Sequence, residues 1–244
     1  MRRSSPNCSS VARENQRLIQ ALRELDTAAI VRVLEEFVTT ERASRLKSVF
    51  AQRLMGVTVL MDAPHDPHNG AAVIRSCDAF GVQQLHVVER IEGFLASNTV
   101  ARGSERWVDV HAYPTPAAGI AAMRASGHEL VSTHPLGELV PTDLASIPRL
   151  CLVFGNERDG IHAELAAACS RRVRVPMRGF AESLNVSVTA AILLQHATDG
   201  RPGDLDADEQ RLRYARALVL TIPRAPEILV VKGVPVDALT VAMA

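Results

Sequence analysis

Short segments rich in β-branched and other strand-forming residues recur through the middle of this 244-residue chain and alternate with helical stretches. The segments cover residues 57–61, 84–88, 106–110, 129–133, 150–154 and 172–175. The helical stretches between them include residues 70–80, 116–125 and 161–168. Strands that are apolar throughout are typically buried on both faces, and their alternation with helices indicates a parallel sheet. We therefore predict an α/β fold in which helices cover both faces of a parallel sheet.

The two ends of the chain have a helical pattern instead. Between residues 11 and 55, apolar residues recur at every third or fourth position, which predicts two or more amphipathic helices. Residues 199–204 are rich in Pro, Gly and Asp and predict a linker, residues 206–220 predict another helix, and the proline-containing end is expected to be extended. The predicted organisation is a helical N-terminal extension, a central domain, and a linker with a helix and tail, over residues 1–55, 56–198 and 199–244.

Charge is balanced overall but uneven along the chain. The formal net charge is zero, which argues against indiscriminate binding of polyanions. Residues 1–56 nevertheless carry ten Arg or Lys against six Asp or Glu, and a second basic cluster contains Arg171, Arg172, Arg174 and Arg178. Most of these cations are arginines, whose planar fork matches phosphate. Each cluster is therefore either a solvated face or a phosphate-binding surface.

The cysteines and the N-terminal residues bear on the compartment. Cys8, Cys77, Cys151 and Cys169 show neither paired nor zinc-type spacing. Residues 1–20 lack the apolar core of a signal peptide, and no uninterrupted apolar run approaches membrane-spanning length. These features predict a reduced, cytoplasmic protein.

Glycine-containing turns follow two of the predicted strands. The chain has neither a GxGxxG sequence after its first strand nor a GxxxxGK[ST] sequence, so neither a Rossmann dinucleotide site nor a P-loop is predicted. Instead, the turns occupy residues 154–160 and 176–179. Ligands of open α/β folds bind at the carboxyl ends of the strands. These two turns are therefore the predicted ligand site.

Polar side chains also accompany two apolar helices. Ser183 and Asn185 precede an apolar stretch with helical spacing, where such residues either cap the helix or hold a ligand against its free N–H groups. Arg75 lies in the helix of residues 70–80 and is expected to point back toward Asn69. It is either a surface residue paired with Asp78 or a group that binds a phosphate or an oxyanion.

Three segments together resemble motifs of the SPOUT superfamily of trefoil-knotted methyltransferases, in its SpoU/TrmH branch. Residues 69–81 match N-x-[GS]-A-x-x-R-[ST]-x-[DE]-A-x-G, with Ala71 in place of the usual Gly or Ser. Residues 154–160 match F-G-x-E-x-x-G, and residues 176–188 match P-M-x-G…S-L-N-V-S-V. The match covers roughly residues 55–198. The helical flanks are most similar to the tRNA guanosine-2′-O-methyltransferases of that branch.

The resemblance implies a fold and a reaction. The fold would be a parallel sheet with a deep C-terminal trefoil knot, flanked by N- and C-terminal helices. The reaction would be methyl transfer from S-adenosylmethionine (SAM) to a ribose 2′-hydroxyl of structured RNA, with a guanosine in the D-loop of tRNA preferred and ribosomal RNA second. The protein would act as a homodimer through the knot and would need no metal. The alternative from another class is a non-catalytic RNA-binding or ribosome-assembly protein with the same fold.

The resemblance also implies roles for individual residues. The catalytic set would be Arg75, Asn69, Glu157, Ser183 and Asn185. The SAM contacts would be Thr133, Phe154, Gly155, Asn156, Val175, Met177, Leu184 and Val186. The RNA contacts would be Arg13, Arg17, Arg42, Arg45, Lys47 and Arg53 on the basic N-terminal helices.

The family resemblance implies that Arg75 activates the 2′-hydroxyl. Because guanidinium groups stay charged in proteins, we expect a cation that stabilises the developing alkoxide and not a general base. Asn69 would orient Arg75 or the ribose, and Glu157 would help to hold Arg75 or the substrate. His65 and His68 with Asp66 imitate a metal-ligand set, but Pro67 between the two histidines and the family resemblance favour ordinary loop histidines.

Overall fold

The protein divides into two compact units. The computed structural model describes residues 8–64, 66–89, 103–156 and 158–243, the side chains of residues 8–14, 240 and 243 excepted. The sheet unit is built from Leu54–Arg201 together with N-terminal residues up to Ala12, and the helical unit from Arg13–Arg53 and Pro202–Ala244. The two flanks of the chain, predicted as separate segments, thus belong to one unit.

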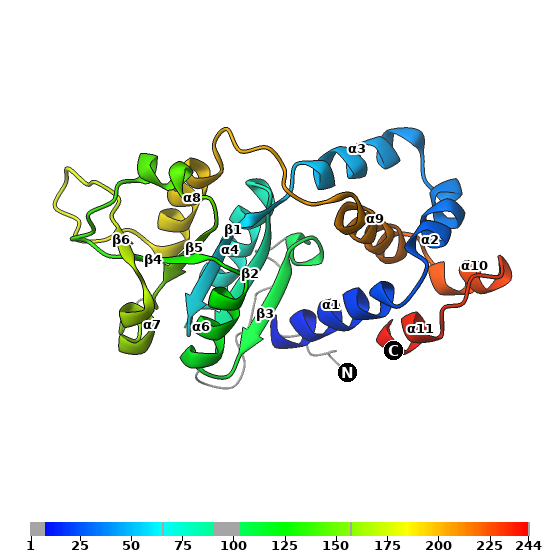
Figure 1. Ribbon diagram of the computed structural model, residues 1–244, viewed down its shortest axis with the longest axis horizontal. Coiled ribbons are helices and arrows are strands. Elements are labelled where there is room, and N and C mark those ends of the chain that lie inside the picture. The colour runs from blue at the N-terminus through cyan, green and yellow to red at the C-terminus, as the bar shows by residue number, and fades with distance from the viewer. Residues whose placement is uncertain (1–7, 65, 90–102, 157, 244) are drawn as a thin grey trace. The chain divides into compact units, whose positions relative to one another are not determined.

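The sheet unit contains, within the described residues, a six-stranded sheet (Figure 1). Its strands are β1 (Leu54–Asp62), β2 (Val82–Val88), β3 (Asp109–Tyr113), β4 (Glu129–Thr133), β5 (Leu150–Phe154) and β6 (Arg171–Val173). The spatial order is β3-β2-β1-β5-β4-β6, and each pair of neighbours is parallel. The predicted parallel α/β architecture is confirmed.

Helices cover both faces of this sheet. Val59 and Met61 of β1 belong to a core cluster with residues of α4 and α8, whereas Leu60 between them packs with residues of α6 and α7. This alternation follows from the two-residue period of a strand, and it explains why β1 is apolar except at Thr58 and the terminal Asp62. The covering helices are α4 (Pro67–Ala79), α8 (Val186–Thr198), α6 (Pro116–Ala125) and α7 (Ala163–Ala168).

The strand order places a topological switch point between β1 and β5. The chain proceeds from β1 to β2 and β3 on one side, and β5, β4 and β6 lie on the other side. Asp62 ends β1 and Phe154 ends β5. Parallel sheets bind ligands in the crevice outside the carboxyl ends at such a point. The fold therefore presents the turn after Phe154 at the expected binding edge.

The helical unit brings the two flanks of the chain together. Its helices are α1 (Cys8–Arg23, most of which lies in this unit), α2 (Thr27–Leu34), α3 (Thr40–Ala51), α9 (Ala207–Thr221), α10 (Ala225–Val231) and α11 (Asp237–Met243). Helix α2 packs against α9 and α10, and α3 packs against α9. Leu22, Ile30, Leu34 and Leu218 are fully buried. The amphipathic helices predicted at each end thus bury their apolar faces in this unit.

Two details of the predicted elements are wrong. The segment 106–110 was expected to be a strand, but residues Ser104–Arg106 form a 3₁₀ turn and β3 begins only at Asp109. The C-terminal end was expected to be extended, but it forms α10 and α11. Pro226 lies in the first turn of α10, where a missing N–H breaks no intrahelical bond, and buried Leu229 anchors that helix.

A short 3₁₀ helix, η3 (Pro141–Ser146), precedes β5, and another, η1 (Glu35–Phe37), follows α2.

Among the described residues, no helix is both long enough and apolar enough to cross a membrane.

We predict that the protein loses stability in acid, because the sheet contains a buried histidine. The ring of His86 on β2 stacks on that of His111, its partner in register on β3, with 4.9 Å between centroids. Its Nδ1 lies 3.0 Å from the Tyr113 hydroxyl. Burial, followed by the nearby His111 and His128, holds the pKa of His86 well below its usual 6.5.

Below about pH 6.5 the unfolded chain therefore binds a proton that the folded protein excludes, so the free energy of unfolding should fall as pH decreases. His86→Gln should flatten this dependence by up to one proton, or about 1.4 kcal/mol per pH unit. Urea unfolding of both proteins between pH 5 and pH 7.5 checks the prediction, and equal slopes would contradict it.

Candidate functional site

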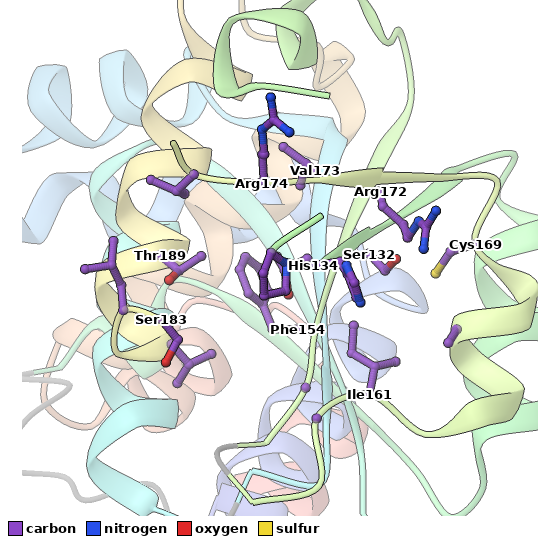
Figure 2. Close-up of a pocket in the computed structure, with 18 of the residues that line it drawn as sticks. Ser132, His134, Phe154, Ile161, Cys169, Arg172, Val173, Arg174, Ser183 and Thr189 are labelled. Atoms are coloured by element: carbon purple, nitrogen blue, oxygen red, sulfur yellow. The ribbon is translucent and has the colours of Figure 1, made fainter. Parts of the chain in front are cut away.

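A cavity of about 1060 Å³ opens at the carboxyl ends of β4, β5 and β6 (Figure 2). Phe154 and His134 lie near its middle in Figure 2, Ser183 and Thr189 on the α8 side, and Cys169 on the opposite side. The walls come from the turns after three strands, from the entry into α8, and from the end of α7 with β6. This is the edge at which the sequence predicted a ligand site, and its volume is that of a small-molecule pocket.

The residues predicted to contact SAM are brought together here. All of them line the cavity: Thr133, Phe154, Gly155, Asn156, Val175, Met177, Leu184 and Val186. Phe154 is fully buried at the base, whereas Met177 and Leu184 are 38% and 37% exposed. Four chain segments, three of them at least 18 residues apart in the sequence (Thr133, 154–156 and 175–177), therefore line one cavity. Their individual contacts with a ligand stay a prediction.

The turn after β5 is held tightly by its own backbone and by Asn156. The N–H of Asn156 donates to the carbonyl of Gly160 (3.1 Å), and the N–H of Gly160 donates in return (3.2 Å). The side-chain Oδ1 of Asn156 accepts from the N–H groups of Arg158 (2.9 Å) and Asp159 (2.7 Å). A Cβ at Gly155 would lie 2.3 Å from the carbonyl carbon of Gly160, so only glycine fits there. The turn is a preformed piece of the cavity wall.

Asp62 anchors the far end of this turn and was missed by sequence reasoning. It is fully buried at the end of β1, and its Oδ2 accepts a hydrogen bond from the N–H of His162 at 2.6 Å. The bond ties the turn after β5 to the central strand of the sheet. An acidic residue directly after the apolar run 57–61 was the available signal. His162 directly follows the lining residues Gly160 and Ile161, so Asp62 is a candidate positioning residue for this wall.

Asn185 links α8 to α4. Its Oδ1 accepts hydrogen bonds from the N–H (2.8 Å) and the hydroxyl (2.6 Å) of Ser187, so Asn185 caps the N-terminus of α8. Its Nδ2 donates to Oδ1 of Asn69 at 3.0 Å. Asn69 is only 8% exposed in the first turn of α4, which Asp66 caps by accepting from the N–H of His68 (2.8 Å). The capping role considered for Asn185 from the sequence is present in the geometry, and the residue lines the cavity, whereas its contact with a ligand stays a prediction.

The remaining predicted catalytic residues are placed less centrally. Ser183 is exposed and lines the cavity. Arg75 is exposed on α4 and is not among the lining residues. Within the described residues Arg75 makes no ion pair, including the pair considered with Asp78. Glu157 lies outside the described residues, as does His65.

Cys169 lines the cavity as an inert thiol. Burial raises its pKa to about 11, and its Sγ donates to the carbonyl of Leu165 at 3.1 Å. Together with Cys77 and Cys151 it is a free cysteine. In the part of the chain that the structure describes, no group of three or more His, Cys, Asp or Glu could hold a metal ion.

The residues predicted to contact RNA differ in whether their charged groups are exposed to solvent. Arg17, Arg42 and Arg45 are exposed. Lys47 is exposed too, but its Nζ lies 2.5 Å from Oε1 of Glu35. Arg53 is 2% exposed, and a buried guanidinium does not reach RNA, so we remove it from the predicted contacts. The side chain of Arg13 lies outside the described residues.

Separating the two roles of Asn185 gives a testable result. Asn185→Ser keeps a good capping side chain but is too short to reach Asn69, whereas Asn185→Ala removes both interactions. The alanine variant should lower the free energy of unfolding by about 1–2 kcal/mol, and the serine variant by less. Both should bind SAM more weakly than the wild type in calorimetry, because the bridge to α4 is lost. Wild-type SAM affinity in the serine variant would contradict a role for the bridge.

Fold and site together define the class. This is a parallel α/β protein with a small-molecule cavity built from turns at the carboxyl edge of its sheet, beside the switch point. Residues 56–195 match the model of the SpoU rRNA Methylase family. The chain belongs to that family, which confirms the resemblance of its three motifs.

Individual relatives agree with this assignment. The tRNA (guanosine(18)-2'-O)-methyltransferase of Escherichia coli K12 is 33% identical over 157 residues, which cover 64% of this chain and 69% of that protein. The crystal structure of the A. aeolicus TrmH/SpoU tRNA modifying enzyme is similar with a TM-score of 0.67 and 28% identity, over 78% of this chain and 99% of that one. An AdoMet-bound rRNA methyltransferase from Sinorhizobium meliloti is similar with a TM-score of 0.53 and 31% identity, over 62% and 59% of the two chains.

Proposed function

We propose that this protein transfers a methyl group from SAM to the ribose 2′-hydroxyl of a guanosine in tRNA. The observation that carries the proposal is the cavity in which the motif segments 154–160 and 176–188 meet, with Asn185 joined to Asn69 of the motif 69–81. The tRNA (guanosine(18)-2'-O)-methyltransferase of E. coli supports this substrate, because it is 33% identical to this chain over 69% of its own length.

The cavity fits SAM in volume and in chemistry. Backbone groups of the turns at Thr133, Gly155 and Val175 offer donors and acceptors for an adenine, and Phe154 and Leu184 supply apolar contact. SAM supplies an electrophilic methyl group, and no protein nucleophile is needed. The protonated thiol of Cys169 is consistent with direct transfer. The AdoMet-bound relative from S. meliloti supports the same cosubstrate.

The chain's own residues would act on the acceptor ribose. The 2′-hydroxyl loses its proton as it attacks, so negative charge develops on its oxygen. Arg75 has no partner among the described residues, and as a permanent cation it would stabilise this charge and hold the neighbouring phosphate. A phosphate oxygen or water would take the proton. Asn69 and Asn185 would fix the floor under the ribose, and Ser183 and Glu157 would complete the site.

Family membership also supports three finer proposals. The segment that enters α8 would thread a trefoil knot, and two copies would associate through this region. Apolar side chains there are exposed, with Phe180 fully so and Val188 at 46%, which suits a dimer contact. Light scattering on the purified protein tests the dimer.

A reduced, cytoplasmic setting stays a prediction, and the free Cys77 and Cys151 are compatible with it.

Ribosomal RNA is the second candidate substrate. The description of the matching family and the S. meliloti relative both name rRNA. The decisive assay measures transfer from labelled SAM to unmodified tRNA and rRNA and then maps the methylated ribose. We expect labelling of tRNA at a single guanosine. Labelling of rRNA alone would reject the tRNA proposal, and SAM binding without transfer to either would favour a non-catalytic RNA-binding protein.

A further inference from the structure

Three arginines of the second basic cluster, Arg171, Arg172 and Arg174, line the cavity, and the fourth, Arg178, follows the lining residue Met177 in the chain. The four side chains have unequal electrostatic environments. Arg171 is paired with Glu129 through two parallel hydrogen bonds, from Nε to Oε1 at 2.7 Å and from Nη2 to Oε2 at 2.8 Å. These hydrogen bonds hold the pKa of Glu129 below its usual value. The pair joins β6 to β4, and the charge of Arg171 is neutralised within the sheet.

Arg172 also has an acidic neighbour. Its backbone N–H donates to Oε1 of Glu138 at 2.9 Å, and its guanidinium Nε lies 3.8 Å from Oε2 of the same carboxylate. Glu138 belongs to the segment after β4, which runs beside β6. Two of the four positive charges are therefore balanced by carboxylates from neighbouring segments.

Arg174 and Arg178 differ from these two residues. Both are exposed, and within the described parts of the chain neither guanidinium makes a hydrogen bond or ion pair. The backbone of Arg174 is fixed, because its N–H donates to the carbonyl of Leu139 at 3.0 Å. Arg174 lies on the cavity wall, and in Figure 2 its side chain extends away from Phe154 and His134. Arg174 is therefore a cation with a hydrogen-bonded backbone whose side chain points away from the middle of the cavity.

We propose that Arg174 and Arg178 bind the phosphate backbone of the RNA substrate at the edge of the cavity. The proposal rests on the proposed function, since it requires RNA to approach this edge. Guanidinium forks match phosphate oxygens, and unopposed cations neutralise phosphates with release of counterions. The outward direction of Arg174 favours a ligand outside the cavity over the carboxylate of SAM inside it. The sheet unit would thus hold the RNA strand independently of the basic helices at the N-terminus.

The test is the salt dependence of binding to an unmodified tRNA transcript. The variants are Arg174→Gln, Arg178→Gln and the double substitution, which keep side-chain length and remove charge. Each lost phosphate contact should reduce the slope of log affinity against log salt concentration by about 0.7–0.9, so the double variant should lose about 1.5. Arg124→Gln is the matched control, because Arg124 is exposed on α6 and does not line the cavity. Its slope should equal that of the wild type.

SAM binding, measured without RNA, distinguishes the outcomes. We expect all four variants to bind SAM within about twofold of the wild type. Unchanged salt slopes in the double variant would overturn the proposal, and so would tRNA binding too weak to measure in the wild type. A loss of SAM affinity with an unchanged slope would instead assign Arg174 to the cosubstrate. Altered slopes in a protein that transfers no methyl group would retain this inference and reject the proposed reaction.

Discussion

Replacing Arg75 with alanine should reduce methyl transfer to tRNA by about 100- to 1000-fold, the usual effect of removing a group that stabilises developing negative charge. SAM affinity should stay within about twofold of the wild type, because Arg75 does not line the cavity. Stability should change by less than about 0.5 kcal/mol, since the side chain is exposed and has no partner in the described structure. The loss would therefore be confined to the chemical step and to RNA binding.

Single-turnover transfer with saturating tRNA separates those two contributions. Arg75→Lys keeps the charge but not the planar fork, so its rate should fall between those of the wild type and the alanine variant. Arg124→Ala removes an exposed helical arginine far from the motifs and should keep wild-type activity. A wild-type rate in Arg75→Ala would reject the assigned role of Arg75 while leaving the methyltransferase assignment intact.

Gly155→Ala should damage both the stability and the SAM site. The added Cβ would lie 2.3 Å from the carbonyl carbon and 2.5 Å from the carbonyl oxygen of Gly160, and 2.6 Å from the backbone nitrogen of Ile161. These are backbone atoms of a turn that Asp62 and Asn156 hold in place, so they yield only with the turn itself. We expect a loss of about 1–3 kcal/mol in the free energy of unfolding. SAM affinity should fall at least about tenfold, equivalent to 1.4 kcal/mol.

Two other glycines provide matched comparisons. A Cβ at Gly179 meets no atom within 4 Å, and its φ is not positive, so Gly179→Ala should be close to neutral. Gly160 also has open space, but its φ of +67° makes an alanine there strained by about 1–2 kcal/mol. Calorimetric SAM titration and urea unfolding of the three variants check the order. Wild-type SAM affinity in Gly155→Ala would mean that the turn is not a rigid wall.

Much of the sheet unit was predictable because its signals are local. A strand buried on both faces, such as β1, is largely apolar, and the turns that follow β5 and β6 carry glycines at fixed spacing. The segment before β3 was misassigned because β-branched residues and tryptophan favour strands even where a 3₁₀ turn forms. The C-terminal helices were missed because proline signals an interruption, although it is tolerated in the first turn of a helix.

The candidate site was predictable as a set of residues but not as a set of contacts. The motifs placed Asn69 and Asn185 in one site, and the structure joins them by a hydrogen bond across 116 positions of sequence. Asp62 was overlooked because its partner is a backbone N–H that lies 100 positions away. Likewise, the burial of Arg53 is a property of the tertiary structure that no local pattern reveals.

The sequence by itself determined the family, the alternation of strands and helices, and the three motifs, since these depend on residue type and spacing along the chain. Only the tertiary structure decided which polar groups are already committed. It shows Asn185 as both cap and bridge, and it pairs Arg171 with Glu129 while leaving Arg174 exposed. The physical reason is that the charge a side chain offers to a ligand depends on its neighbours in space, and in a parallel sheet those neighbours come from distant parts of the chain.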